Sequence, residues 1–501
     1  MKYLIFRYEV PHFKIVKKSH DCNIYGMRFF MKKLFLILML ALSTACPMLF
    51  AASFTQNDSR LSQFTEYLDE INKVYHIPGM AFVITNPDET LLEKAYGQCT
   101  SLDQLFYIGS MSKSYTAVCI MQLVEKGLVK LEDDISLYLP DYKFSKPVTI
   151  LALLNHTSGF DTHAKLHNVK QKDSYGHYEY ANVNYDLLGK IIEAVSGQTY
   201  EDYIQQNLFD PLGMDDSRAN AWAVKDSPKL LLGNRNYFGF FKQGQTDIPT
   251  EKSWFHEPAG YIATSPHNHA KYLRMYLNDG KAGGSENSEN SGNSENSAAH
   301  LLSPESIQKM WYKNVSEESK QYDLYYGMGW NYMNWQGQPM IFHGGQVENG
   351  ITFQYILLDK KLAVCFMINA SDYLVMNNLM NDVVFDGVGI LNGKDAPVIN
   401  HTRWFLLHLA LNTIYLIMLG LSVFFLIKVR KPLLCLICFL VWPLFLLTFT
   451  RLLLNTPLWV VRLFVPDFYG IIIASAVIAF AGGIFRLVKI ISDKRFSRLN
   501  K

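Results

Sequence analysis

The sequence predicts an α+β fold: an antiparallel sheet of the five-stranded type, flanked by helices and carrying an α-helical insert, followed by a three-helix transmembrane region. Two observations predict the folded part. Apolar strands separated by turn residues lie near both ends of this folded part, and amphipathic helices lie next to these strands in the sequence. A third observation predicts the membrane part, because three long and nearly uncharged apolar stretches lie in the last hundred residues.

The composition excludes some classes of function. The chain has 47 Lys and Arg against 45 Asp and Glu, a net charge of +2, whereas a dedicated nucleic-acid binder carries a strongly basic face. Its 7 cysteines are scattered and odd in number, which predicts no disulfide framework. No Cys-x-x-Cys pattern is joined to histidines as in zinc sites. We therefore expect no metal, no other cofactor and no nucleic-acid partner.

Residues 1–52 are predicted to be an N-terminal extension with an export signal. The basic start at residues 31–33 and the short apolar run at 34–42 have the anatomy of such a signal, and the run is too short to span a bilayer. Cleavage is expected after Ala45 or near Ala51. The signal places the following residues outside the cytoplasm.

Residues 54–400 are predicted to form the extracytoplasmic domain. It begins with an amphipathic helix over 58–75 and a hairpin of strands over 80–85 and 91–96. The later elements are, in order, helices over 110–126 and 184–196, a disordered Ser-Glu-Asn loop over 283–297, a hairpin over 351–357 and 362–368, and a helix over 373–385.

Residues 404–485 are predicted to contain three transmembrane helices, over 404–427, 432–450 and 463–485. Basic residues are concentrated in the first connection and in the tail 486–501, so both should be cytoplasmic. An odd number of spans then places the folded domain outside a cell membrane, in agreement with the export signal. The lipid bilayer is thus an expected partner.

The first chemical motif is Ser110-Met111-Ser112-Lys113. Residues i and i+3 share a helix face, so the lysine amine can lie beside the serine hydroxyl. Burial lowers the pKa of a lysine and makes the neutral amine available as a base. Although such a motif is common by chance, the apolar residues and the glycine before Ser110 place it at a helix N-terminus, where backbone N–H groups can stabilise an oxyanion.

Two further motifs suit the same chemistry. Tyr180-Ala181-Asn182 supplies a phenol that can relay a proton and an amide that can bind a substrate carbonyl. His343-Gly344-Gly345 lies on or at the end of a strand, where glycines allow close approach of a ligand. We expect His343 to polarise a substrate carboxylate or the tyrosine, against the plainer interpretation of a structural strand-end histidine.

Taken together, the motifs resemble the serine β-lactamase-like and penicillin-binding protein superfamily, which includes class C β-lactamases, DD-peptidases and the peptidase S12 family. The resemblance extends over about residues 60–390 in the family's order. Its segments are residues 108–117, 129–134, 138–140, 153–159, 180–189, 211–214, 258–261 and 343–346.

The resemblance implies a role for each site residue. Ser110 would be acylated, Lys113 and Tyr180 would share the acid–base work, and Asn182 would contact substrate. His343, Gly344 and Gly345 match the family's Lys-Thr-Gly strand, and the backbone N–H groups of Ser110 and Gln346 would form the oxyanion hole. His343-Gly344 replaces the usual Lys-Thr, which weakens the binding of an anionic carboxylate and argues against efficient β-lactam turnover.

The expected function is that of a membrane-anchored serine hydrolase that acts on D-amino-acid-containing peptides, esters or β-lactams. One alternative is a prodrug-activating peptidase of a nonribosomal peptide pathway, since the architecture is similar to that of the colibactin maturation peptidase. That peptidase has an acidic residue and a serine where this chain has Tyr107 and Asn182. The other alternative is a penicillin-binding sensor that is acylated without turnover.

Overall fold

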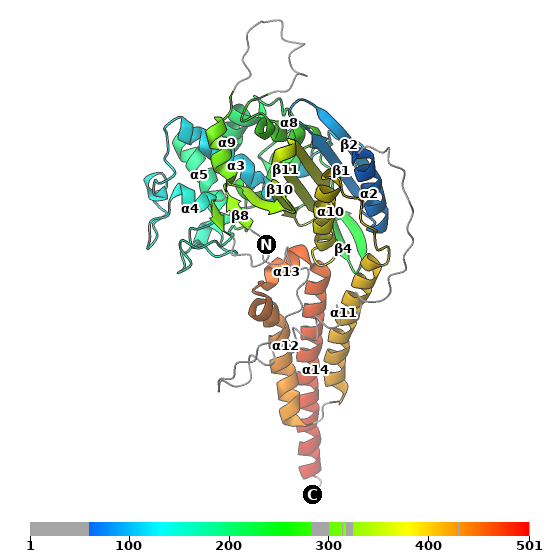
Figure 1. Cartoon of the computed structure of the whole chain (residues 1–501). Coiled ribbons are helices and arrows are strands. Elements are labelled where there is room, and N and C mark those ends of the chain that lie inside the picture. The colour runs from blue at the N-terminus through cyan, green and yellow to red at the C-terminus, as the bar shows by residue number, and fades with distance from the viewer. Residues whose placement is uncertain (1–59, 283–299, 313, 317–323, 429–430, 500–501) are drawn as a thin grey trace, which may run out of the picture.

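The computed structural model describes residues 60–282, 300–312, 314–316, 324–428 and 431–499. The predicted export signal and Ser-Glu-Asn loop lie outside these residues. The described chain forms a folded domain on a stem of long helices (Figure 1).

The main sheet is antiparallel and has the order β2-β1-β12-β11-β10-β9-β8-β7. Five strands, from β2 to β10, correspond to the expected sheet, and β9, β8 and β7 extend it. The strands are β1 Gly79–Thr85, β2 Thr90–Gly97, β7 Val315–Ser316, β8 Leu324–Gly327, β9 Trp330–Trp335, β10 Gln338–Val347, β11 Gly350–Leu357 and β12 Leu362–Ile368. Two small sheets join β3 Phe106–Tyr107 to β6 Ala263–Thr264, and β4 Gly233–Tyr237 to β5 Phe240–Gly244 and β13 Ala370–Ser371.

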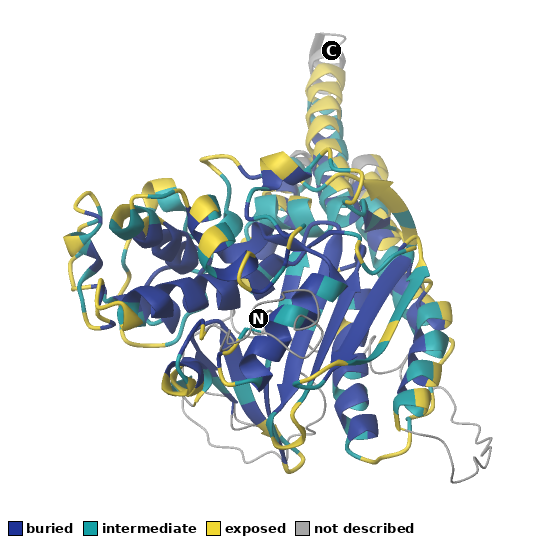
Figure 2. Cartoon of the chain, turned by 90° about the horizontal axis from the view of Figure 1, so that it is seen from above, coloured by how far each residue is buried: buried dark blue, intermediate teal, exposed yellow. Residues whose placement is uncertain are grey.

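Helices cover both faces of the main sheet, and Figure 2 shows the buried strands between them. Successive residues of a strand point to opposite faces, so Phe82 of β1 joins the core under α2 (Arg60–Val74) and α10 (Met376–Leu391). Ala81 joins the larger core under α3 (Ser112–Glu125) and α8 (Pro266–Leu277). The fold class predicted from the sequence is confirmed.

The predicted helical insert is built around α5, Val183–Ser196, whose buried stripe includes Leu187, Leu188 and Ile191. The smaller helices of the domain are α4 Ile150–Leu154, α6 Tyr200–Ile204, α7 Ala221–Val224 and α9 Pro304–Trp311. Left of the sheet in Figure 1, α4 and α5 form part of a separate lobe.

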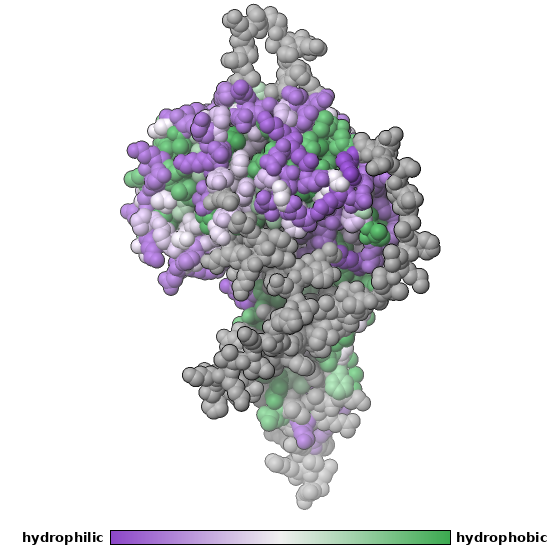
Figure 3. Space-filling view, in the orientation of Figure 1, coloured by the Kyte–Doolittle hydropathy of each residue, from purple (hydrophilic) through white to green (hydrophobic). Residues whose placement is uncertain are grey.

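The stem consists of α11 Arg403–Lys428, α12 Pro432–Leu454 and α14 Pro466–Leu499. Each of these helices is long and apolar enough to cross a membrane. A short helix that the sequence did not predict, α13 Leu458–Phe464, lies between α12 and α14 at the end of the stem nearest the folded domain (Figure 1). Figure 3 shows the contrast between the largely hydrophilic surface of the domain and the apolar stem.

Candidate active site

Ser110 lies on a short 3-10 helix, Gly109–Met111, that leads into α3. Gly109 has φ +53°, and a Cβ at this position would lie 2.1 Å from the backbone nitrogen of Gln346. Only glycine therefore permits both this turn and this approach to β10. The serine is placed where the start of α3 meets the second half of β10.

Lys113 is fully buried beside Ser110. Its Nζ lies 3.0 Å from Ser110 Oγ, 2.8 Å from Asn182 Oδ1 and 2.7 Å from the carbonyl oxygen of Ala259. Burial lowers the pKa of Lys113 to about 7, against the opposing effect of Asp186, whose negative charge raises it. An amine in this environment is a base available near neutral pH.

Tyr180 contacts the same serine from another direction. Its phenol donates a hydrogen bond to Ser110 Oγ at 2.7 Å, and Lys113 Nζ lies 4.9 Å from the centre of its ring. Tyr180 and Asn182 come from the loop that leads into α5, as their spacing before the predicted helix suggested. The structure thus brings Ser110, Lys113, Tyr180 and Asn182 together from two segments.

Of the two partners expected for His343, a substrate carboxylate or the tyrosine, the structure places it beside the tyrosine. Its side chain is fully buried, and its Nδ1 hydrogen-bonds the carbonyl oxygen of Gly344 at 2.7 Å. Burial, with the nearby charge of Lys113, lowers the pKa of His343 to about 3, so the imidazole is neutral. The ring centre lies 6.4 Å from that of Tyr180 and 5.9 Å from that of Tyr326. In this conformation His343 supports the tyrosines and presents no surface to a substrate carboxylate.

The glycines of the His343-Gly344-Gly345 motif allow the backbone of β10 to approach Ser110 closely. A Cβ on Gly345 would lie 1.9 Å from the carbonyl oxygen of Ile108, which makes glycine a steric requirement there. β9 pairs with β10 only as far as Phe342, so Gly344 and Gln346 lie beyond this pairing. The Gln346 side chain donates to Ser371 Oγ at 3.2 Å.

Sequence reasoning gave no role to His156, which is buried and has φ +57°. Its Nδ1 accepts from the backbone nitrogen of Ala181 at 3.3 Å and pairs with Asn184 Nδ2 at 2.8 Å. Its ring centre lies 4.4 Å from that of Tyr180. His156 therefore holds the Tyr180 loop, and the only signal for it was its place in the segment 153–159 that resembles the family.

Sequence reasoning also gave no role to Asp186 and His256, a pair that supports the surroundings of Lys113. Asp186 on α5 is buried and accepts from the backbone nitrogen of His256 at 3.0 Å and contacts its Nδ1 at 2.9 Å. Burial opposes the charge of His256, but the hydrogen bond and negative charge of Asp186, the carbonyl oxygen of Thr250 and the charge of Glu257 together outweigh it and raise the pKa of the imidazole. This pair fixes the start of a short π-helical turn, Glu257–Tyr261, which supplies the Ala259 carbonyl.

Metal ligands do not gather at this site. Over the part of the chain that the structure describes, no group of three or more His, Cys, Asp or Glu side chains is arranged to hold a metal ion.

Comparison with known proteins identifies the same region. The Beta-lactamase family profile matches residues 64–388. Penicillin-binding protein 4 of Amycolatopsis lactamdurans is 23% identical over 67% of this chain and 91% of its own length. Protein flp of Staphylococcus aureus is 25% identical over 70% of this chain and 68% of its own length.

Solved structures share the fold. The octameric penicillin-binding protein homologue from Pyrococcus abyssi has a TM-score of 0.55 at 23% identity, over 69% of this chain and 79% of its own. The D-amino acid amidase from Ochrobactrum anthropi has a TM-score of 0.55 at 20% identity, over 67% and 99%. A class C β-lactamase from Rhodobacter sphaeroides has a TM-score of 0.52 at 16% identity, over 66% and 100%.

Proposed function

Because the chain belongs to the beta-lactamase family and is a serine hydrolase, we propose that Ser110 is its acylated nucleophile and that it cleaves amides, esters or lactams containing a D-amino acid unit. The observation that carries this proposal is the position of Ser110 Oγ between an amine of lowered pKa and a phenol, 3.0 Å from Lys113 Nζ and 2.7 Å from Tyr180 OH.

The hydrogen bonds around Lys113 suit the role of base. A neutral amine has two hydrogens, which Asn182 Oδ1 and the Ala259 carbonyl oxygen can accept. Its lone pair is then directed to the proton of Ser110, and Asn182 serves as a partner of the base. The three oxygens around Nζ are uncharged, so none of them holds the amine in its protonated form.

The proposed reaction follows from this arrangement. Ser110 Oγ bonds to the substrate carbonyl carbon while its proton passes to Lys113, and the backbone N–H groups of Ser110 and Gln346 bind the oxyanion. The bond to the leaving group then breaks, and the leaving nitrogen or oxygen receives that proton through Tyr180. Water attacks the resulting ester by the same route in reverse, which releases the acid and restores Ser110.

Two features support the choice of substrate class. The structural relative from Ochrobactrum anthropi is a D-amino acid amidase. In addition, a buried and neutral His343 stands at the position of the family's lysine, so this position lacks the fixed positive charge that would attract a carboxylate. D-aminoacyl amides and esters, which lack a carboxylate, are therefore better substrates, in this proposal, than anionic β-lactams.

We also propose that residues 54–400 form the catalytic domain outside the membrane, that the stem within 404–485 anchors it, and that 486–501 is cytoplasmic. The three apolar helices and the basic residues around residue 430 and in the tail support this arrangement.

The test uses the full chain in detergent with D-phenylalanine amide, L-phenylalanine amide and a nitrophenyl ester of a D-amino acid. We expect turnover of the D-amide and the ester, little turnover of the L-amide, and complete loss in Ser110→Ala. Turnover that persists in Ser110→Ala, or its absence with all three compounds in folded protein, contradicts the proposal.

A further inference from the structure

We infer that the membrane helices position the oxyanion side of the active site, through two contacts that meet at the segment of residues 346–349. The inference rests on the proposed function, because it assigns these contacts to the Ser110 reaction. It gives the stem a catalytic task besides anchoring.

The first contact is a buried pair between His408 of α11 and Asp372 of the folded domain. His408 Nε2 lies 2.8 Å from Asp372 Oδ2, and His408 Nδ1 lies 3.0 Å from the carbonyl oxygen of Trp404. Both paired side chains are at least nine-tenths buried, with 6% and 7% exposure. Loss of one partner leaves a polar group buried without the other, so the pair constrains the position of both segments.

The neighbour of Asp372 touches the oxyanion strand. Ser371 Oγ accepts a hydrogen bond from Gln346 Nε2 at 3.2 Å and another from Asn377 Nδ2 at 3.4 Å. The backbone nitrogen of Asp372 also donates to Asn377 Oδ1 at 3.1 Å, which makes this corner rigid. His408 is thus linked through Asp372 and Ser371 to the residue whose N–H would bind the oxyanion.

The second contact holds the tip of the β4–β5 hairpin. The backbone nitrogen of Phe238 donates to Asp467 Oδ2 of α14 at 3.0 Å, and its carbonyl oxygen accepts from Asn412 Nδ2 of α11 at 2.9 Å. Two stem helices therefore bind both backbone groups of a single residue of the folded domain.

The base of this hairpin reaches the same segment as the first contact. The backbone nitrogen of Asn234 donates to the carbonyl oxygen of Asn349 at 3.0 Å, and Asn349 Nδ2 donates to that of Gly244 at 2.9 Å. In β13, Ser371 pairs with Arg235 of β4. Both contacts therefore end within three residues of Gln346.

The junction between the stem and the folded domain leaves little empty space. A cavity of about 10 Å³ lies between Asp372, Tyr415 and Asp467, which is room for roughly one water. Close-packed interiors transmit strain. Because oxyanion donors act mainly in the transition state, a small displacement should slow acylation without weakening binding.

The experiment measures acylation of the full chain by a fluorescent penicillin in detergent, separating the acylation rate constant from the dissociation constant. Removing one oxyanion donor outright costs roughly 100-fold or more, so we expect His408→Leu, which displaces one, to lower the rate constant about tenfold. The dissociation constant should stay within about twofold, and His408→Gln, which keeps an N–H for Asp372, should restore most of the rate.

The matched control is Arg403→Gln. Arg403 also begins α11 and joins the folded domain through an ion pair of 2.8 Å, but its partner is Asp382 on α10, away from Gln346. Because this ion pair involves neither Asp372 nor Ser371, we expect acylation by this variant to stay within twofold of the unaltered protein. An equal loss in Arg403→Gln would show that any damage to the junction slows the enzyme and would overturn the inference.

Ser371→Ala keeps the inference testable if His408→Leu does not fold. It should slow acylation severalfold, and the double variant should lose less than the product of the single losses, because both changes act through Gln346. Acylation at the normal rate in folded His408→Leu and in Ser371→Ala overturns this inference and leaves the proposed function intact. Failure of the folded, unaltered protein to be acylated at Ser110 by either the penicillin or the nitrophenyl ester of a D-amino acid overturns both.

Discussion

Lys113 shows how one environment makes a side chain both buried and reactive. The apolar surroundings of α3 exclude water from the amine, which disfavours its charged form. Three uncharged oxygens surround it within 3.0 Å, and they orient the amine without stabilising its charge as a carboxylate would. Asp186 acts from farther away and limits the lowering of the pKa. In the proposed mechanism, Lys113 can act as a base because of where the chain places it.

This placement predicts the pH dependence of acylation. Since the neutral amine is the active form, the acylation rate constant should rise as pH increases through about 7, the pKa of Lys113, and then level off. A pH profile of acylation by a fluorescent penicillin between pH 5 and 9 checks this. Lys113→Arg keeps a positive charge but cannot lose it, and should lower the rate at least about 100-fold at every pH. A flat profile would contradict the assignment of Lys113 as base.

Sequence spacing predicted some residues of the site and missed others for a physical reason. The interval from Ser110 to Lys113 fixes two side chains on one helix face, so their contact follows from local geometry. The burial of His343 and the left-handed backbone of His156 depend on segments far away in the chain. No local pattern reports them, so the sequence left His343 with three possible roles, at a substrate carboxylate, at the tyrosine or in the structure alone, and gave His156 no role.

In the proposed mechanism, the oxyanion hole depends on the junction between the Gly109–Met111 turn and β10. In Gly109→Ala, the new Cβ would lie only 2.1 Å from the backbone nitrogen of Gln346, so one of the two backbone segments would have to move. We expect acylation to fall at least about 100-fold, the usual loss when an oxyanion donor is removed, with folding retained or weakened. Stopped-flow acylation and thermal unfolding in detergent measure the two effects.

Gly127→Ala is the matched control. Gly127 also has a positive φ, +69°, but no atom lies within 4 Å of the place that a Cβ would take there. It should lose about 1 kcal/mol of stability from backbone strain and keep its acylation rate. Equal acylation by the two glycine variants would show that the approach of Gln346 has no catalytic importance.

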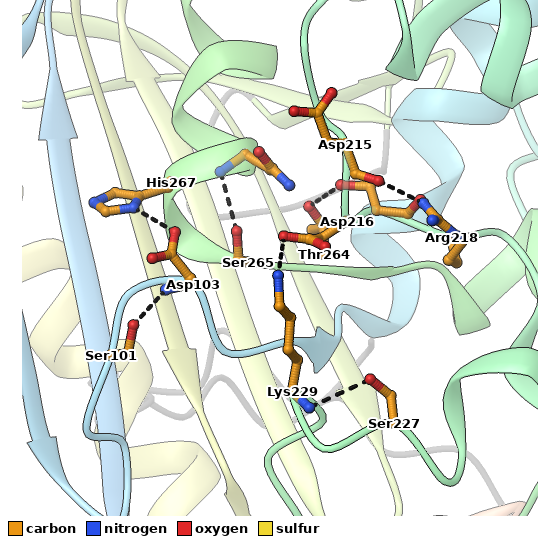
Figure 4. A network of polar contacts seen from close by, with 12 residues as sticks. Ser101, Asp103, Asp215, Asp216, Arg218, Ser227, Lys229, Thr264, Ser265 and His267 are labelled. Atoms are coloured by element: carbon orange, nitrogen blue, oxygen red, sulfur yellow. Dashed lines mark hydrogen bonds and ion pairs between the residues drawn. The ribbon is translucent and has the colours of Figure 1, made fainter.

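A clamp formed by His267, Asp103 and Glu93 ties β2 to the start of α8. Figure 4 shows His267 directed at Asp103, whose backbone nitrogen donates to Ser101. His267 Nδ1 lies 2.8 Å from Asp103 Oδ1, and His267 Nε2 lies 3.0 Å from Glu93 Oε2. Burial opposes the imidazolium, but the two carboxylates outweigh it and raise the pKa of His267.

The clamp should make stability depend on pH. The pKa of His267 is higher in the folded protein than in the unfolded chain. The clamp therefore contributes fully to stability below about pH 6.5, the ordinary pKa of histidine, and this contribution is lost as pH rises through the folded pKa. At pH 5.5, we expect the melting temperature of the unaltered protein to be roughly 1–2 °C higher than that of His267→Asn. The difference is small because both ion pairs are partly exposed. The difference should vanish by pH 8.5. A constant difference across this range would rule out a stabilising imidazolium.

The elements followed the sequence where their pattern was local. The helices over 58–75 and 184–196 and the hairpin over 351–368 were recognised from apolar periodicity and turn residues, and appear as α2, α5 and β11–β12. The extension of the sheet by β7 to β9 was not, because Gly327 to Trp335 offers short, aromatic segments whose pairing depends on β10. Likewise, α13 was hidden in a stretch interpreted as a connection.

At the scale of the whole molecule, the stem is more than a tether beneath an independent domain. Trp459 of α13 has its ring centre 5.4 Å from that of Trp254, and Lys165 Nζ lies 4.8 Å from the Trp459 ring. Trp254 in turn donates to the carbonyl oxygen of Thr162 at 2.9 Å. With the contacts at Phe238 and Asp372, the stem meets the folded domain at several places, which fixes the direction that the site faces relative to the stem.

The proposed orientation predicts the behaviour of reporter fusions. Green fluorescent protein fused after Lys501 should fluoresce in bacteria, because it folds in the cytoplasm, whereas alkaline phosphatase at the same point should be inactive. Alkaline phosphatase inserted after Asn455, between α12 and α13, should be active outside. The opposite pattern would contradict the orientation and would leave the catalytic geometry unaffected.

The most direct test of the central claim is mass spectrometry of the full chain after exposure to a fluorescent penicillin, beside Ser110→Ala. We expect a mass increase on the peptide that contains Ser110, its absence in the variant, and its decay over minutes as water releases the acyl group. A label that persists would identify an acylated receptor without turnover. A label on another residue, or none on folded protein with either penicillin or D-aminoacyl esters, would contradict the assignment of Ser110 as the nucleophile.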